Sequence, residues 1–216
     1  MAALGLESLF VMNDKQKKFQ ISVVILSYNN EGFVEEAIES ALNQTYPPEE
    51  IILNDDNSTD STWKIIQHYQ EMYPRVKAYQ NTKNLGIGGN LNKALKRPNF
   101  DWVTVFAADD KFLPQKLEHE VKAIQESGFP IAYSKVRVIS PDGEKLRSWN
   151  FRDSPPSGEV LEEVVGRKFF QNTQSLYRNE LMHQKVIQEL SEYNEELTQY
   201  EDWDFKIRQA ANFKFA

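Results

Sequence analysis

The chain has 216 residues, which fits one ordinary domain with a single core and excludes two large domains. Hydrophobic residues make up 40% of it, enough apolar mass to exclude a mainly disordered chain. The net charge of −7, without a long basic run, argues against a nucleic-acid partner. The absence of Cys excludes disulfides and a thiol nucleophile and suits a reducing compartment, so we expect a cytoplasmic location.

The first residues do not have the pattern of a secretory signal. Residues 1–19 place apolar side chains before Lys15, Lys17 and Lys18, the reverse of the charge-then-apolar order of such a signal. We therefore expect residues 1–19 to be a leader that precedes the fold. The longest apolar runs are far shorter than the roughly 20 residues that span a bilayer, so no span is expected in this part of the protein.

The first half of the chain alternates short apolar runs with amphipathic segments. Continuous, β-branched runs are typical of strands buried on both faces of a parallel sheet. The predicted strands are 21–26, 51–53, 76–79 and 102–106. The predicted helices between them are 31–42, a segment from about 61 to 73, and 86–95. This alternation predicts an α/β sheet with right-handed crossovers.

The second half is expected to be α+β. Its pattern predicts a helix at 114–127, a strand at 131–139 and an antiparallel turn at 141–143. Further predicted elements are a loop at 153–158, a strand at 173–177 and a closing helix at 200–211.

Polar and acidic residues follow three of the predicted strands. They are Ser27 to Asn30, Asp55 to Ser58, and the pair Asp109–Asp110. In an open α/β sheet, ligands bind beyond the carboxyl ends of the parallel strands, which is where these residues fall. They could instead cap the following helices, and we favour that interpretation for Ser58. Capping does not require two adjacent acids at two places, however, so a divalent cation bound to a phosphorylated ligand is the simpler explanation.

The phosphate motifs of two common folds are missing after the first strand, where neither Gly-x-Gly-x-x-Gly nor a P-loop occurs. The glycines of 84–89 come later and are better explained as a helix start. A metal is then needed to offset the charge of a diphosphate. Tyr28 could offer a stacking face to a base, although an exposed Tyr at a strand end is also common.

Five ordered motifs resemble those of the family 2 inverting glycosyltransferases with the GT-A fold. They are Ile21 to Asn29, Ala41 to Tyr46, Asp55 to Asp60, Asn84 to Gly86, and Ala108 to Asp110. The resemblance covers residues 20–140 closely, and beyond them it rests on Glu201–Asp202. It implies a Rossmann-like α/β fold with a mostly parallel central sheet, flanking helices and a smaller antiparallel portion.

The resemblance also implies roles for single residues at the donor site. Leu26, through its backbone, and Tyr28 would border the nucleobase, and Asp56 would hydrogen-bond it. Asp109 would face the ribose, and Asp110 would coordinate Mn²⁺ or Mg²⁺ between the two phosphates. The family often has a further Asp where this chain has Ala107, which leaves fewer protein oxygens for the metal.

The implied reaction is a single displacement that inverts the anomeric carbon, with Asp202 as the catalytic base. The donor would be a nucleoside-diphosphate sugar, with UDP expected, and the acceptor a saccharide or a lipid-linked hydroxyl. Without the resemblance, Glu201 and Asp202 could simply complement a helix dipole.

The expected domain is 20–216, with a nucleotide-binding half at 20–110 and an acceptor-side half at 111–216. Family members commonly continue beyond the point where this chain ends, so we expect a truncated C-terminus and peripheral attachment at the inner membrane face through the missing region. Two alternatives remain. A sugar-phosphate nucleotidyltransferase would need a Gly- and Arg-rich loop after the first strand, and a non-catalytic nucleotide-sugar-binding domain would need no base.

Overall fold

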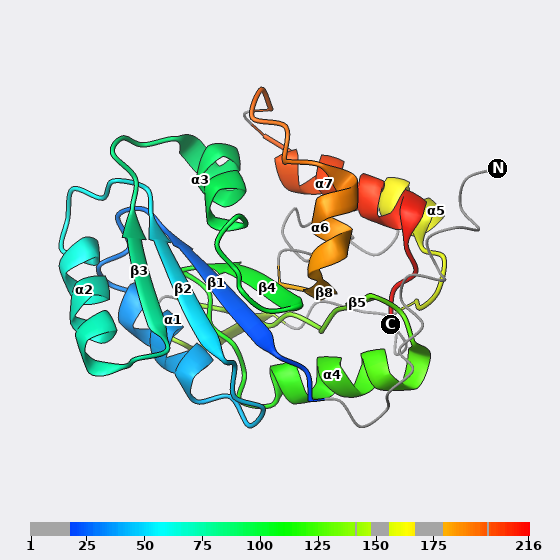
Figure 1. Cartoon of the computed structure of the whole chain (residues 1–216), viewed down its shortest axis with the longest axis horizontal. Helices are drawn as coiled ribbons and strands as arrows, with labels where there is room; N and C mark the ends of the chain where they lie inside the picture. The colour runs from blue at the N-terminus through cyan, green and yellow to red at the C-terminus, as the bar shows by residue number, and fades with distance from the viewer. Residues whose placement is uncertain (1–17, 141, 148–155, 167–178, 198) are drawn as a thin grey trace.

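A six-stranded sheet with the order β3-β2-β1-β4-β8-β5 forms the centre of the protein (Figure 1). The computed structural model describes residues 18–140, 142–147, 156–166, 179–197 and 199–216. The six strands are β1 (Ile21–Ser27), β2 (Glu50–Asp55), β3 (Val76–Gln80), β4 (Trp102–Ala107), β5 (Ile131–Ala132) and β8 (Leu181–His183).

The four strands predicted in the first half form the parallel part of the sheet. β1 pairs in parallel with β2 on one side and with β4 on the other, and β3 extends the sheet beyond β2. β8 runs antiparallel between β4 and β5. The structure thus confirms the expected α/β class with a mostly parallel sheet and a smaller antiparallel portion.

Helices cover both faces of the sheet. The side chains of α1 (Val34–Leu42), α2 (Thr62–Met72) and α4 (Lys116–Ser127) share one core with alternate residues of the central strands. α3 (Gly86–Ala94) packs on the opposite residues of the same strands, Val24, Ile52 and Val105 among them. Because successive strand residues point to opposite faces, a strand covered on both faces is apolar throughout, as the sequence of β1 indicates.

A third apolar cluster holds the C-terminal part of the chain. It is built by α5 (Leu161–Val165), α6 (Gln184–Leu190) and α7 (Glu201–Asn212), together with β5 and β8. The predicted closing helix is therefore confirmed as α7. Beyond it, Phe215 is fully buried and bridges to both Ile131 and Gly158, which ties the last residues to the sheet edge.

The predicted strand at 131–139 is wrong as one continuous element. β5 ends at Ala132, and β6 (Val138–Ile139) belongs to a separate hairpin with β7 (Lys145–Arg147). β5 pairs with the three-residue β8 and with the bridge from Phe215 to Ile131, neither of which extends beyond Ala132, and the hydroxyl of Ser134 donates to the buried carboxylate of Glu120. The predicted antiparallel connection is confirmed by the pairing of β6 with β7, and Gly143 has φ +82°. Pro141 of the predicted turn lies outside the described residues.

Several expected segments fall wholly or partly outside the described residues. These are the predicted strand at 173–177, residues 153–155 of the predicted loop, and residues 1–17 of the expected leader. Phe19, also in that leader, is buried and packs its ring 4.8 Å from that of Trp102, so this residue belongs to the core. Among the described helices, none is long and apolar enough to cross a membrane.

Candidate active site

A pocket of about 330 Å³ opens at the carboxyl ends of the parallel strands. The ends of β1 and β4 form its floor, Asp56 and the start of α3 form one wall, and Glu201 and Asp202 come from the start of α7. β2 and β3 extend the sheet from one side of β1, whereas β4 adds on the other, so the pocket lies at the switch point of the strand order. Crevices at this position are the usual ligand sites of open α/β sheets.

The loops after β1 and β2 hold one another at the rim. Asn29 accepts a hydrogen bond from the backbone N–H of Thr59 and donates its own N–H to the hydroxyl of Ser58. Asn29 and Asn57 both have positive φ, at 53° and 63°, a conformation that Asn adopts more readily than most residues. The polar residues after β1 and β2 therefore hold the two loops together at the rim of the pocket.

Asp55 and Asp56 have different surroundings although they are neighbours. The fully buried carboxylate of Asp55 accepts hydrogen bonds from Ser27, Ser58 and Gln80, so it joins β1, β3 and its own loop. Asp55 does not line the pocket. The capping interpretation favoured for Ser58 is wrong, because the N-cap of α2 is Ser61, without a side-chain cap bond, and the hydroxyl of Ser58 donates to Asp55 instead.

Asp56 lines the pocket and is only 3% exposed. Its carboxylate accepts hydrogen bonds from Asn81 at 2.8 Å and from the backbone N–H groups of Leu85 and Gly86, each at 2.9 Å. These donors occupy most of the lone pairs of a carboxylate. Asp56 thus anchors the start of α3 in addition to presenting an edge to the pocket.

The glycine-containing segment 84–89 begins α3, as the sequence predicts. Gly86 has φ +76°, and the side chain of Asn84 accepts a hydrogen bond from its N–H at 2.8 Å. A Cβ on Gly89 would come within 2.9 Å of the Cβ of Leu85, so the glycine allows this tight helix start.

Leu26 and Tyr28 lie at the end of β1 where the sequence places them. Both line the pocket, and Tyr28 is 45% exposed. A ring that remains open to solvent beside an apolar floor can stack on a planar ligand.

The two acids after β4 differ in their position relative to the pocket. Asp109 and Asp110 are both exposed, but Asp109 lines the pocket and Asp110 stands outside its lining. The backbone N–H of Asp110 donates to the carbonyl of Ala107 at 2.9 Å, which makes a turn directly after the strand.

The acidic pair fits a cation that arrives with its ligand. In the part of the chain that the structure describes, no three His, Asp or Glu side chains are grouped to hold a metal ion. Mg²⁺ is commonly held by one or two carboxylates together with substrate phosphates, and Asp109 and Asp110 can supply that number.

Asp202 faces the same pocket as Asp56 and Asp109, although more than 90 residues separate it from the acidic pair. Its carboxylate accepts a hydrogen bond of 2.9 Å from the N–H of Trp203. Glu201, Asp202 and Asp204 all lie in the first turn of α7, where negative charge complements the helix dipole. Asp202 can therefore complement the helix dipole and at the same time present its carboxylate to the pocket.

Some pocket residues had no predicted role. Asn90 is buried, and its side-chain oxygen accepts hydrogen bonds from Asn54 at 2.6 Å and Asn81 at 2.9 Å. Glu201 also lines the pocket, and the sequence signal that could have found it is its position next to Asp202, for which a role was predicted. Tyr193 lines the pocket and bonds to Asn92, which is 101 positions earlier in the sequence. No local sequence pattern indicates such a contact.

The pocket lies at the switch point of a mostly parallel sheet and is lined by Asp56, Asp109 and Asp202, which places the chain among the open α/β proteins with a ligand site at this edge. Residues 22–185 match the family described as Glycosyl transferase family 2. The chain belongs to this family, and it has the GT-A fold.

One relative and two solved structures illustrate the similarity. The chain is 30% identical over 199 residues to an uncharacterised glycosyltransferase of Methanocaldococcus jannaschii, covering 90% of this chain and 66% of that protein. Two solved structures share the fold. S. aureus TarS 1-349 in complex with UDP has a TM-score of 0.73 at 22% identity, covering 92% of this chain and 60% of that one. The mannosyltransferase PcManGT of Pyrobaculum calidifontis, with GDP-Man and Mn²⁺, has a TM-score of 0.69 at 17% identity, covering 97% and 59%. The chain thus spans less than two thirds of the length of each of these proteins.

Proposed function

We propose that this chain is the catalytic domain of an inverting glycosyltransferase that moves a sugar from a UDP-sugar to an acceptor hydroxyl. The observation that carries the proposal is the presence of Asp56, Asp109 and Asp202 in one pocket at the carboxyl ends of the parallel strands. In this proposal the donor extends from Asp56 past Asp109, with its sugar toward α7.

Uracil is the base that we assign to the donor. Tyr28 offers a stacking face, and the backbone of Leu26 borders the same space. Asp56 presents an acceptor for the ring N–H of uracil, and its bonds to Leu85 and Gly86 hold that acceptor in place. The UDP complex of TarS, a protein of the same fold, supports this choice, whereas PcManGT is complexed with GDP-Man.

We assign the ribose to Asp109 and a divalent cation to Asp110, with Asp109 beside it on the pocket wall. When bound, the cation would offset the negative charge that develops on the departing diphosphate. The Mn²⁺ complex of PcManGT supports metal use in this fold.

In the proposed reaction, the carboxylate of Asp202 accepts the proton of an acceptor hydroxyl. The acceptor oxygen forms a bond to the anomeric carbon of the donor as the bond from that carbon to the diphosphate oxygen breaks, and UDP leaves with the bonding electrons. Attack comes from the face opposite the leaving group, so the configuration inverts. General-base assistance of this kind typically contributes about 10²- to 10⁴-fold.

Donor binding and product stereochemistry test the proposal. Calorimetry with UDP, GDP and ADP, each with Mn²⁺ and with a chelator, should give the tightest binding for UDP with Mn²⁺. NMR of the chain with UDP-glucose or UDP-N-acetylglucosamine should then show the sugar released to water with inverted configuration. UDP binding without any sugar release would favour the non-catalytic binding domain. Retention of configuration would contradict the mechanism.

The second substrate in this proposal is the acceptor. We propose a saccharide or lipid-linked hydroxyl, which would approach along the side of the pocket formed by the start of α7. We also propose peripheral attachment to a membrane surface, which a binding experiment with phospholipid vesicles would test.

A further inference from the structure

Both polar atoms of the Asn92 side chain, on α3, form hydrogen bonds with residues 193–195, which lie far away in the sequence. Its oxygen accepts a hydrogen bond of 2.7 Å from the N–H of Tyr193, and its nitrogen donates to the Tyr193 carbonyl at 2.9 Å. The same nitrogen donates to the carboxylate of Glu195, also at 2.9 Å. Asn92 is only 4% exposed, so loss of these bonds would leave a buried polar group unsatisfied.

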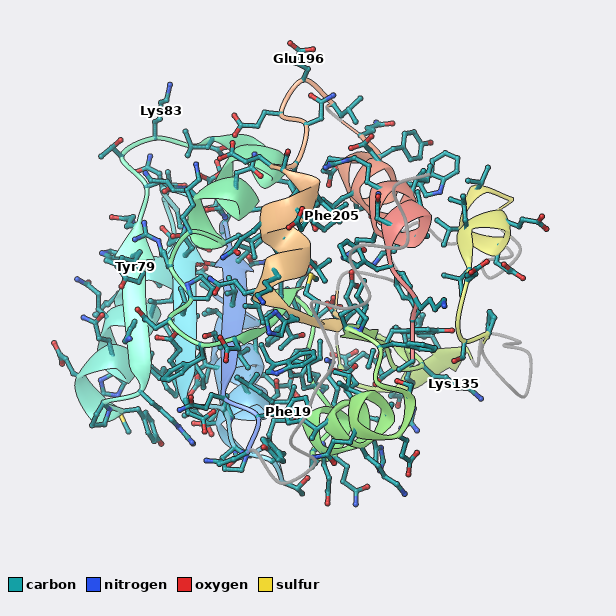
Figure 2. All side chains as sticks on the ribbon, turned by 45° about the vertical axis from the view of Figure 1, so that its right-hand side comes forward. Phe19, Tyr79, Lys83, Lys135, Glu196 and Phe205 are labelled. Carbon is teal, nitrogen blue, oxygen red and sulfur yellow. The ribbon has the colours of Figure 1, made fainter. Side chains whose placement is uncertain are left out.

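The glycines of α3 allow this close approach. A Cβ on Gly88 would lie 3.6 Å from the Cα of Glu195 and 3.9 Å from the carbonyl of Asn194, so any larger side chain would meet that backbone. In Figure 1, α3 stands beside α6 and the chain that leads to α7, and Figure 2 labels Glu196 at the top of that connection. The sequence motif at 86–89 thus provides a surface for residues 193–195.

Tyr193, which bonds to Asn92 of α3, also contacts α7. Its ring stacks on that of Phe205 with centroids 4.1 Å apart and an interplanar angle of 14°. Phe205 is 1% exposed and lies three residues after Asp202, which is about one helical turn. Arg208 of the same helix donates to the carbonyls of Leu190 and Glu192, which holds the preceding segment from the other side.

The other end of α3 is bound to the donor site. Asp56 accepts hydrogen bonds from the backbone of Leu85 and Gly86 at the start of this helix. α3 therefore bridges Asp56 on one wall of the pocket and the first turn of α7 on the facing wall.

We infer that Asn92 is a positioning residue, which sets the first turn of α7, and with it Asp202, against the donor site through the Tyr193–Phe205 stack. The inference rests on the proposed function for its catalytic consequence. Asn92 itself does not line the pocket and is assigned no contact with substrate.

Asn92→Ala is the direct test, with Lys96→Ala as its matched control. Lys96 forms an exposed ion pair with Glu192 between the same two regions, and exposed pairs of this kind contribute little. In Asn92→Ala, we expect faster amide hydrogen exchange at residues 202–205 and a UDP affinity within about threefold of the wild type. Turnover should fall by about 10- to 100-fold, because small displacements of a reacting group have effects of that size. Lys96→Ala should match the wild type in all three measurements.

A second variant covers the case in which Asn92→Ala does not fold. Gly88→Leu raises the helix propensity of α3 but places a side chain against residues 194–195, so it should speed the same amide exchange without destabilising α3 itself. Unchanged exchange at 202–205 in both folded variants would overturn the inference.

A double-mutant cycle separates this inference from the proposed function. If Asn92 acts through Asp202, adding Asn92→Ala to Asp202→Asn should reduce turnover no further, whereas full multiplication of the two losses would overturn the inference. If Asp202→Asn alone leaves turnover unchanged, the proposed base is wrong, and the exchange measurement still decides whether Asn92 holds α7.

Discussion

The carboxylate of Asp56 accepts a hydrogen bond of 2.9 Å from the backbone N–H of Gly86, the first residue of α3. The bond links the residue that follows β2 to the start of α3, and both lie on the same wall of the donor pocket. One side chain thus fixes the local backbone and presents an acceptor to the ligand, so its loss should affect both stability and binding.

Asp56→Asn tests this double role. The new amide can satisfy only part of the donor set formed by Asn81, Leu85 and Gly86, and an unsatisfied buried donor costs about 1–3 kcal/mol. We expect urea denaturation to show a loss of that size together with weaker UDP binding. Asp101→Asn is the control, because Asp101 is exposed and its change should stay within about 0.5 kcal/mol. Weaker binding with unchanged stability would show that Asp56 is not an anchor.

The two acids after β4 should differ in their effects. Asp110→Asn should remove the stimulation of UDP binding by Mn²⁺, whereas Asp109→Asn should weaken UDP binding both with Mn²⁺ and with a chelator, because Asp109 is the one on the pocket wall. Calorimetry of both variants under both conditions provides the comparison. If Asp109→Asn alone abolishes the metal effect, the metal ligand is Asp109 and the assignment to Asp110 is wrong.

Sequence patterns predict the parallel half of this fold because its information is local. The apolar run of β1 reflects a strand covered by α1 on one face and α3 on the other. The carboxyl ends of such strands share one edge, so the positions of Asp56 and Asp109 follow once the strands are known.

The antiparallel half is less accessible to the same reasoning. β5 and β8 are only two and three residues long. β8 pairs with β5 and with β4, and the paired residues lie about 50 to 80 positions apart in the sequence. The contact between Asn92 and Tyr193 is likewise invisible to periodicity, since an Asn in a helix carries no sign of a partner 101 residues away.

Glu50 should give the fold a dependence on acid pH. Burial alone would raise its pKa, but hydrogen bonds from Lys77, Asn99 and Ser22 outweigh burial and lower the pKa below the ordinary 4.5. Because the folded-state pKa is the lower one, the stabilisation is complete above about pH 4.5 and is lost as the pH falls through the folded-state value.

Urea denaturation of the wild type and Glu50→Gln at several pH values measures this contribution. The difference in free energy of unfolding should be largest near neutral pH and shrink toward pH 3. Glu71→Gln, at an exposed position, should show no such trend. A difference between wild type and Glu50→Gln that is constant with pH would mean that the charge of Glu50 is not what stabilises the fold.

The most direct test of the central claim is turnover and UDP affinity of Asp202→Asn beside those of Asp204→Asn. Both acids lie in the first turn of α7, but Asp204 pairs with Arg208, whereas Asp202 lines the pocket. The substitution at Asp202 keeps the size and polarity of the side chain and removes its ability to accept a proton. We predict that kcat falls by about 10²-fold or more in Asp202→Asn while UDP affinity stays within a factor of a few, and that Asp204→Asn stays close to wild type. Equal kcat in Asp202→Asn and the wild type would contradict the account.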